Sequence, residues 1–308
     1  MKVKVLATEG KGQFTETIYE CPETIEDGLV VKNIMTGVCT SDIAMMQGEF
    51  GPLPLHMQGH EGLGQVVDVG KGVFDRDIQV GDYVATRGEP AYADYYPVRE
   101  GEYVRVPAAE PKYIIEPVAC GINIVQGDLI ELEGRAMAVD GAKLLIIGSG
   151  FLAYIAYQTL KLNNIDIPID VIGRSNDDIW YEAGVDLKER PDRDYEIVIN
   201  LRDNHAWLEQ SDIIQANGLL IDAVGRPISK KESENLLWKA VTTVRPSPRK
   251  ALFHDCMIQA VEWIENGNLR VDDFWTQGYN RDTEWQQAFA DGANRPKFYS
   301  RGYIYWNE

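Results

Sequence analysis

The sequence lacks an apolar run long enough to cross a membrane, since a bilayer-spanning helix needs roughly 20 consecutive apolar residues. The N-terminal stretch MKVKVLATEG alternates between polar and apolar residues like a strand, and it has no apolar core of the kind found in signal peptides. These two absences predict a cytoplasmic protein with no membrane partner.

Positive charge is also scarce. The chain carries 30 Lys and Arg against 48 Asp and Glu, which gives a formal net charge of −18 at pH 7. Nucleic acids and anionic membranes are polyanions, so this surplus of negative charge predicts that the protein binds neither. An anionic ligand needs a locally basic pocket here.

Cysteine is rare and widely spaced, with only Cys21, Cys39, Cys120 and Cys256 in 308 residues. These spacings exclude a C-x-x-C zinc knuckle, and a reducing compartment disfavours disulfides. A buried cysteine can simply act as a small apolar residue. That interpretation suits Cys256, which lies on an apolar helical pattern, better than Cys39 or Cys120.

The length and the pattern of the chain indicate two domains. Short alternating segments separated by glycine predict a β-rich domain over residues 1–122, and we expect the aromatic tail 268–308 to complete it. Over residues 123–267, near-continuous apolar strands alternate with helices, which is typical of a parallel sheet covered on both faces. The predicted fold class is α/β, with a doubly wound parallel sheet in the second domain.

A glycine turn, IIGSGFLA, follows the first apolar strand of this second domain. Its pattern is G-x-G-x-x-A, with Gly148 for the tight turn, Gly150 for the approach of a pyrophosphate and Ala153 for close packing of helix on strand. Phe151 and Leu152 open the helix, whose free N–H groups and positive dipole end suit phosphate. The stretch predicts a dinucleotide-binding turn, and the alternative is a packing turn in an unrelated α/β fold.

The end of the next strand, DVIGRS, bears on which dinucleotide is bound. Gly173 leaves room at the strand tip, while Arg174 and Ser175 can donate hydrogen bonds to a 2′-phosphate, which favours NADP(H) over NAD(H). In the alternative, Arg174 is a solvated loop residue and Asp177 or Asp178 accepts a hydrogen bond from the ribose of NAD.

Five motifs, in order, resemble those of the zinc-containing medium-chain alcohol dehydrogenases. The resemblance extends over essentially the whole chain, including the closing segment WQQAFADGANRPKFY, and implies a GroES-like catalytic domain followed by a Rossmann domain. The five motifs are GVCTSD (37–42), GHEGLGQVVDVG (59–70), VGDYVA (80–85), EPVACG (116–121) and IIGSGFLA (146–153).

The resemblance implies one catalytic zinc held by Cys39, His60 and Cys120. Two thiolates and an imidazole suit zinc, and three protein ligands leave the fourth position open for substrate or water. Glu61 is then the neighbouring carboxylate, which in the family can move in as a ligand. Glu116 is the alternative third ligand, as in the polyol dehydrogenase branch.

Two further residues receive roles from the same resemblance. Asp42 stands behind His60 and fixes its tautomer from the far side of the ring. Ser41 matches the hydroxyl that passes on the proton of the alcohol. The family's next relay member is often a His, but residues 43–45 are Ile, Ala and Met, so this step is missing or replaced.

The chain also departs from many relatives by lacking a structural-zinc lobe. Residues 85–107 contain no cysteine, so we expect one zinc per chain. We also expect a homodimer, in which the last strand of the dinucleotide-binding sheet, near KAVTTVRP (239–246), pairs with its mate and covers an exposed edge.

Together these features predict a zinc-dependent oxidoreductase that transfers hydride between a small-molecule alcohol or carbonyl compound and NADP(H). Two alternatives stay open, a quinone-reductase-like enzyme without zinc and a non-catalytic nucleotide-binding protein on the same fold. The sequence does not identify the alcohol. Residues 47–57 are expected to form a wall of the substrate pocket, with Phe50 and Leu55 as candidates.

Overall fold

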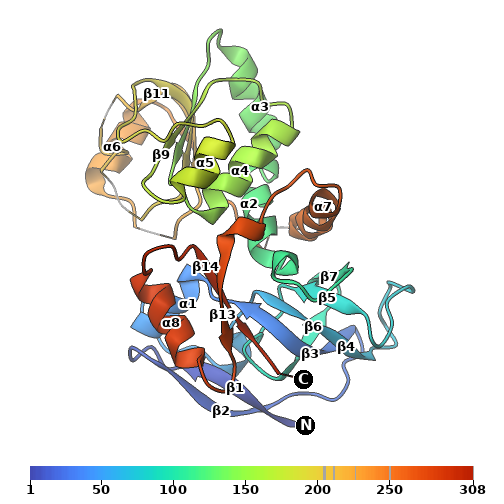
Figure 1. Cartoon of the computed structure of the whole chain (residues 1–308). Helices are drawn as coiled ribbons and strands as arrows, with labels where there is room; N and C mark the ends of the chain where they lie inside the picture. The colour runs from blue at the N-terminus through green and yellow to red at the C-terminus, as the bar shows by residue number, and fades with distance from the viewer. Residues whose placement is uncertain (204–205, 211, 226, 250, 308) are drawn as a thin grey trace. The chain divides into compact units, whose positions relative to one another are not determined.

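The chain forms two compact units in a computed structural model that describes residues 1–203, 206–210, 212–225, 227–249 and 251–307 (Figure 1). Unit 1 comprises Met1–Val118 and Met257–Glu308, and unit 2 comprises Ala119–Cys256. Two helices, α2 (Glu116–Gln126) and α7 (Phe253–Glu265), each run across a boundary between the units. The predicted boundary after residue 122 falls inside α2, and the one after residue 267 falls just beyond α7.

Unit 1 is built on a seven-stranded sheet in the order β13-β14-β3-β4-β5-β7, with β6 also paired to β3 and a separate β1–β2 hairpin. Its elements are β1 (Lys2–Thr8), β2 (Phe14–Glu20), β3 (Gly28–Gly37), α1 (Thr40–Gln47), β4 (Gly62–Val69), β5 (Tyr83–Thr86), β6 (Tyr95–Arg99), β7 (Tyr103–Val106), β13 (Trp275–Asn280), α8 (Trp285–Asn294) and β14 (Arg301–Tyr305), with 3-10 turns at Leu55–Met57, Pro111–Tyr113 and Asp272–Phe274.

The strands of unit 1 follow the alternation of their sequences. In the hairpin, β2 turns Phe14 inward and exposes much of the rest of the strand, which leaves one face polar. The central strand β3 is apolar over Leu29–Val31, and these residues are fully buried in the core of the unit. The β-rich character predicted for this part of the chain is thus confirmed, with the short helix α1 inserted after β3.

The aromatic C-terminal tail belongs to the sheet of unit 1. Strand β14 pairs antiparallel with the end of β3, so that Tyr303 lies opposite Gly37 and Tyr305 opposite Met35. This pairing carries the residues at the start of β14 to the end of β3, where α1 begins.

Unit 2 contains a five-stranded parallel sheet in the order β12-β11-β10-β8-β9. Strands β8 and β10 are buried along their whole length, as expected for a parallel sheet covered on both faces. The elements of the unit, besides part of α2 and of α7, are α3 (Leu129–Ala138), β8 (Leu144–Ile147), α4 (Phe151–Leu162), β9 (Ile169–Ile172), α5 (Asp177–Glu182), β10 (Tyr195–Asn200), β11 (Ile214–Asp222), α6 (Lys230–Trp238) and β12 (Thr242–Val244).

The two edges of this sheet differ. At the β9 edge, Ile172 forms an isolated parallel bridge with Lys188, which belongs to no strand. At the other edge, β12 pairs with β11 alone among the described strands. The prediction that a strand near residues 239–246 is the last of this sheet and lies at its edge is therefore confirmed.

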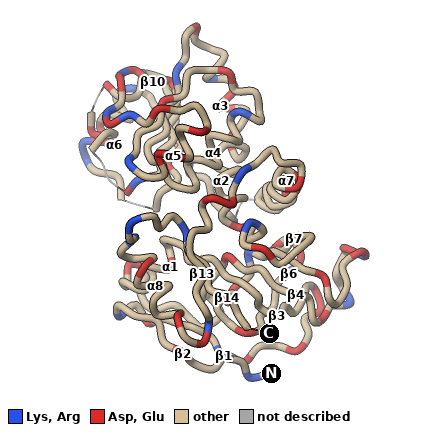
Figure 2. The backbone as a smooth tube through the Cα atoms, viewed as in Figure 1, with Lys and Arg blue, Asp and Glu red and all other residues tan. Residues whose placement is uncertain are grey.

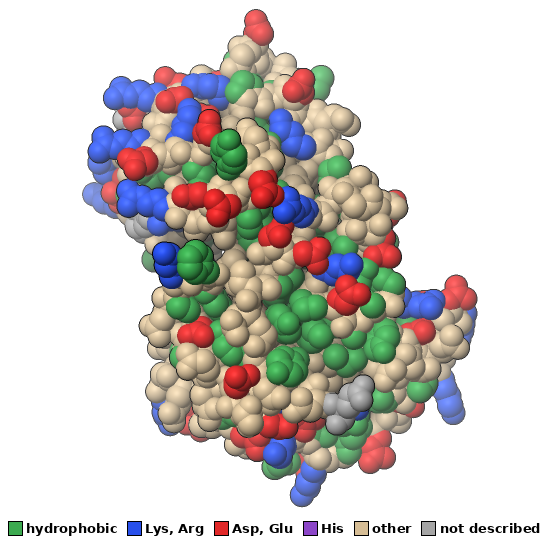
Figure 3. All heavy atoms as spheres, in the orientation of Figure 1, with side chains coloured by type: hydrophobic (Ala, Val, Ile, Leu, Met, Phe, Trp, Pro, Cys, Tyr) green, Lys and Arg blue, Asp and Glu red, His purple; other side chains and the backbone are tan. Residues whose placement is uncertain are grey.

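The surface mixes charges of both signs on each unit, as the backbone and space-filling views show (Figures 2 and 3). Among the described residues, no helix is both long enough and apolar enough to cross a bilayer.

Candidate active site

Strand pairing in unit 1 brings together the two motifs that carry Cys39 and His60. Strands β3 and β4 are antiparallel, with Thr36 opposite Gly62, and the Gly37 N–H donates to the Glu61 carbonyl at 3.0 Å. The residue that caps α1 and the dipeptide that precedes β4 therefore lie side by side.

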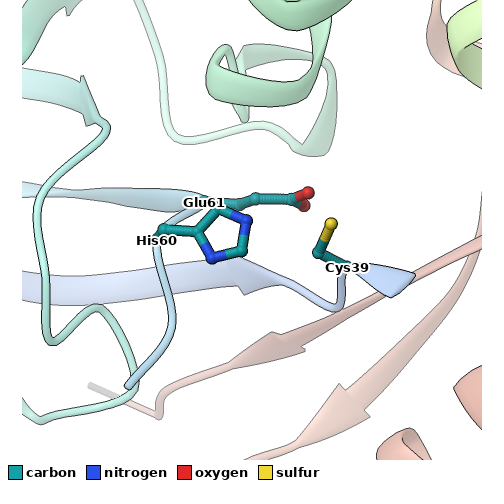
Figure 4. Close-up of side chains that lie close together, drawn as sticks. All are labelled: Cys39, His60 and Glu61. Carbon is teal, nitrogen blue, oxygen red and sulfur yellow. The ribbon is translucent and has the colours of Figure 1, made fainter. Parts of the chain in front are cut away.

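Cys39, His60 and Glu61 form a compact cluster of potential metal ligands. One ligand atom from each residue lies within 4.8 Å of the others, and the thiol, imidazole and carboxylate approach one another at the ends of the two strands (Figure 4). Glu61 is buried, whereas Cys39 and His60 are half-buried. A thiol, an imidazole and a carboxylate are the three donor types that zinc uses in proteins.

Glu61 is held by a residue from the other end of the chain. Arg301, the first residue of β14, donates from Nη2 to both carboxylate oxygens of Glu61, at 2.6 Å to Oε1. The exposed fraction is 11% for the Arg301 side chain and 1% for that of Glu61. A β-carbon at Gly37 would lie 2.0 Å from Glu61 Oε2, so the glycine of the G-x-C motif makes room for this carboxylate.

Asp42 lies next to both Cys39 and His60. It is fully buried, its Oδ2 accepts from the Cys39 N–H at 2.8 Å, and its Oδ1 lies 3.6 Å from His60 Nδ1. The predicted position of Asp42 behind the His60 ring is consistent with this placement, although 3.6 Å is too long for a hydrogen bond.

The electrostatics of the cluster favour positive charge. Burial alone would lower the pKa of His60, but Asp42, a hydrogen bond with Cys39 and the nearby Glu116 carboxylate together raise that pKa well above its usual value. Burial likewise opposes the charge of Arg301, yet Glu61 and Cys39 raise the pKa of the guanidinium. A site that stabilises positive charge and offers sulfur, nitrogen and oxygen donors fits a zinc ion.

The other predicted residues of this site are placed as follows. Ser41 is half-buried in the first turn of α1, two residues after Cys39. Glu116 is buried at the start of α2 in unit 1, and Cys120 lies one helical turn later and belongs to unit 2. The choice between Cys120 and Glu116 as third ligand stays a prediction. Phe50 is 57% exposed and Leu55 37%.

The phosphate turn of unit 2 has the predicted context. It follows β8 and opens α4, with Gly150 at the N-cap, and a β-carbon added to Gly150 would meet no atom within 4 Å. The strand and helix predicted on either side of the turn are confirmed. The side chains of Phe151 and Ala153 are buried and that of Leu152 is half-buried. A phosphate at this turn would therefore bind to backbone N–H groups and not to these apolar side chains.

A residue that sequence reasoning missed, Ser149, joins the phosphate turn to the tip of β9. Its Oγ accepts from the Ser175 N–H at 3.1 Å and lies 3.0 Å from Ser175 Oγ, while its carbonyl accepts from Trp180 Nε1 at 3.0 Å. A β-carbon at Gly173 would fall 1.9 Å from Ser149 Oγ. Gly173 thus gives space to Ser149, and a side chain at this position does not fit.

The charged residues after the strand tip all face solvent. Arg174, Asp177 and Asp178 are exposed, and no ion pair joins Arg174 to another described residue. Each is therefore accessible to a ribose or a phosphate, and both interpretations of the strand tip remain compatible with its geometry.

Comparison with known proteins identifies a domain family within unit 1 and finds dehydrogenases that align with most of the chain. Residues 26–110 match the family of alcohol dehydrogenase GroES-like domains. D-arabinitol dehydrogenase 1 of Uromyces fabae is 23% identical over 92% of this chain and 95% of its own. The alcohol dehydrogenase of Geobacillus stearothermophilus is 30% identical over 56% of this chain and 60% of its own. A dehydrogenase of Sinorhizobium meliloti solved with NADP bound superimposes with a TM-score of 0.72 at 16% identity, covering 99% of both chains.

A GroES-like domain and a Rossmann-type parallel sheet in one chain define a two-domain α/β dehydrogenase, an oxidoreductase. The GroES-like match over residues 26–110 and the alignments with an arabinitol dehydrogenase and an alcohol dehydrogenase support the medium-chain alcohol dehydrogenase family.

Proposed function

We propose that this dehydrogenase is zinc-dependent and transfers hydride between an alcohol or carbonyl substrate and NADP(H). The observation that carries the proposal is the cluster of Cys39, His60 and Glu61, whose donor atoms lie within 4.8 Å of one another. When bound, zinc would act as a Lewis acid toward the substrate oxygen, and the nicotinamide would accept or donate the hydride.

In this proposal Cys39 and His60 are metal ligands, together with Cys120 or, as the alternative, Glu116. Glu61 supplies a carboxylate beside them, and its pairing with Arg301 keeps that carboxylate partly neutralised. Ser41, in the first turn of α1, accepts the proton of the substrate hydroxyl and passes it toward solvent.

For the cofactor, we assign the N–H groups of residues 148–153 to the pyrophosphate, since a helix N-terminus after a glycine turn is suited to anions. Arg174 and Ser175 are assigned to the 2′-phosphate of NADP. Structural neighbours of equal similarity were solved with NADP and with NADH, so they support a nicotinamide dinucleotide and leave the choice between the two to Arg174 and Ser175.

The zinc assignment is tested by elemental analysis of the purified protein and of Cys39→Ser. We expect one zinc per wild-type chain and a loss of most of it in the variant, because a three-ligand set loses a thiolate. Cys21→Ser is the matched control, since Cys21 is a buried, free cysteine elsewhere in unit 1 whose thiol donates to the Pro22 carbonyl. A metal-free protein with full activity would refute the proposal and favour a quinone-reductase-like enzyme.

The third ligand is tested by the same assay on Cys120→Ser and Glu116→Gln. We expect Cys120→Ser to lose the larger share of the zinc, and the opposite ranking would assign Glu116. Activity should then be screened on secondary alcohols and on polyols with both cofactors. Polyols are included because a relative that aligns over most of the chain is an arabinitol dehydrogenase.

A further inference from the structure

Tyr92, a fully buried residue between β5 and β6, lies against the segment that leads to His60. The Tyr92 N–H donates to the Gln58 carbonyl at 3.1 Å, and the Ala91 N–H donates to the Gly59 carbonyl at 3.1 Å. These two hydrogen bonds fix the backbone of residues 91–92 to the two residues that precede His60.

The Tyr92 hydroxyl reaches the other ligand-bearing segment. It donates to Asp42 Oδ2 at 2.7 Å, and the carbonyl of Gly37 lies 3.2 Å away on the β3 side. The same carboxylate oxygen accepts from the Cys39 N–H, and the second oxygen of Asp42 faces the His60 ring. One side chain thus joins the backbone before His60 to the carboxylate that contacts both Cys39 and His60.

The position of this hydroxyl is set by the packing of its ring. The Tyr92 ring meets Phe14 and Phe289 edge-on, with centroids 5.7 and 5.3 Å away. A β-carbon at Gly59 would lie 2.7 Å from the same ring, and Gly59 has a φ of +78°. The ring therefore has little freedom to move, and Gly59 allows the chain to pass directly over it.

We propose that Tyr92 is a positioning residue of the metal centre, which acts through Asp42 to fix Cys39 and His60 relative to each other. This inference rests on the proposed zinc site. The physical reason is that a buried carboxylate with strong hydrogen bonds keeps one orientation, and the partners behind a metal-bound imidazole determine its orientation and basicity.

The test is the zinc dissociation constant of full-length Tyr92→Phe, measured by competition with a chelator. Phenylalanine keeps the ring packing and removes only the hydroxyl. We expect zinc to bind about tenfold more weakly, at the low end of the 10–100-fold range for residues that support metal ligands.

Tyr96→Phe is the matched control. Tyr96 is also fully buried in unit 1, and its hydroxyl bonds to Thr86 Oγ1 at 3.0 Å rather than to Asp42. We expect zinc affinity in this variant to stay within about twofold of wild type, as for a site with no coupling to the metal ligands.

Two further measurements separate positioning from a purely structural role. The visible spectrum of the cobalt-substituted protein should change in Tyr92→Phe and not in Tyr96→Phe, because that spectrum reports ligand geometry. Combining Tyr92→Phe with Asp42→Asn should weaken zinc binding no more than Asp42→Asn does alone, since both act on one carboxylate.

Unchanged zinc affinity and an unchanged cobalt spectrum in Tyr92→Phe would overturn the inference while leaving the zinc proposal intact. Additive effects of Tyr92→Phe and Asp42→Asn would also overturn it, because Tyr92 would then act by another route. A wild-type protein that binds no zinc or cobalt would overturn both proposals.

Discussion

Replacing Arg301 by methionine removes the guanidinium that pairs with Glu61 and leaves that carboxylate buried beside Cys39. Methionine roughly preserves the length and apolar stem of the side chain, so the change is mainly one of charge. Glu61 is only 1% exposed, and solvent cannot take the place of the lost partner. Removing one member of a buried ion pair typically costs about 3–5 kcal/mol, because the remaining charge stays uncompensated.

The assay is chemical and thermal unfolding of the zinc-free protein. For a unit of this size, a loss of about 3–5 kcal/mol corresponds to a decrease in Tm of roughly 6–20 °C. Arg281→Met is the comparison variant, because Arg281 is also buried in unit 1 and pairs with Glu16 at 3.1 Å, away from the cluster of potential ligands. Glu16 is 37% exposed, so water can solvate it after the change and the loss should be smaller.

Added zinc should distinguish the two variants further. Without its guanidinium partner, the Glu61 carboxylate carries its full charge among the potential ligands. Bound metal stabilises a folded protein by an amount that rises with the logarithm of its affinity. Zinc should therefore raise the stability of Arg301→Met by more than it raises that of wild type. It should raise the stability of Arg281→Met by the same amount as that of wild type. A loss below about 1 kcal/mol in Arg301→Met, or an equal gain from zinc in all three proteins, would refute this reasoning.

Three other predictions concern Arg174 at the tip of β9, the imidazole of His60 and the edge strand β12. Arg174→Ala should weaken NADP(H) binding about tenfold to a hundredfold, because one charge-assisted hydrogen bond is lost. NAD(H) binding, measured in the same fluorescence titration, should stay unchanged. Equal weakening of both cofactors would instead favour Asp177 or Asp178 as the residue that binds the ribose. The raised pKa of His60 should stabilise the zinc-free protein fully below about pH 6.5, and this stability should be lost as the pH rises through the folded-state value. Unfolding curves at several pH values test this, and His60→Asn should flatten the dependence. If β12 pairs with its mate, light scattering should give the mass of a dimer, whereas a monomer at micromolar concentration would contradict the interface.

Several residues of the candidate site could be proposed from the sequence because the motifs that carry the family resemblance are short and local. The G-x-C-x-S-D motif follows the strand β3 and the G-H-E motif leads into β4, and these two strands pair as neighbours in the sheet. The phosphate turn is similarly local, since a buried strand, two glycines and a helix follow one another without a break. Each motif is only a few residues long, and the pairing of β3 with β4 is what brings Cys39 and His60 together.

The tertiary structure alone decided which distant residues support these motifs. Arg301 lies 240 positions from Glu61, and Tyr92 lies 50 positions from Asp42. Neither has a local pattern that distinguishes it, because an arginine at the start of a strand and a tyrosine between two strands are common in any fold. Their roles arise from the pairing of β14 with β3 and from the packing of residues 91–92 against residues 58–59. The sequence supplied the candidate donor residues, through motifs a few residues long that resemble those of a known family. Folding determined their buried charge partners, because those contacts depend on which distant strands meet.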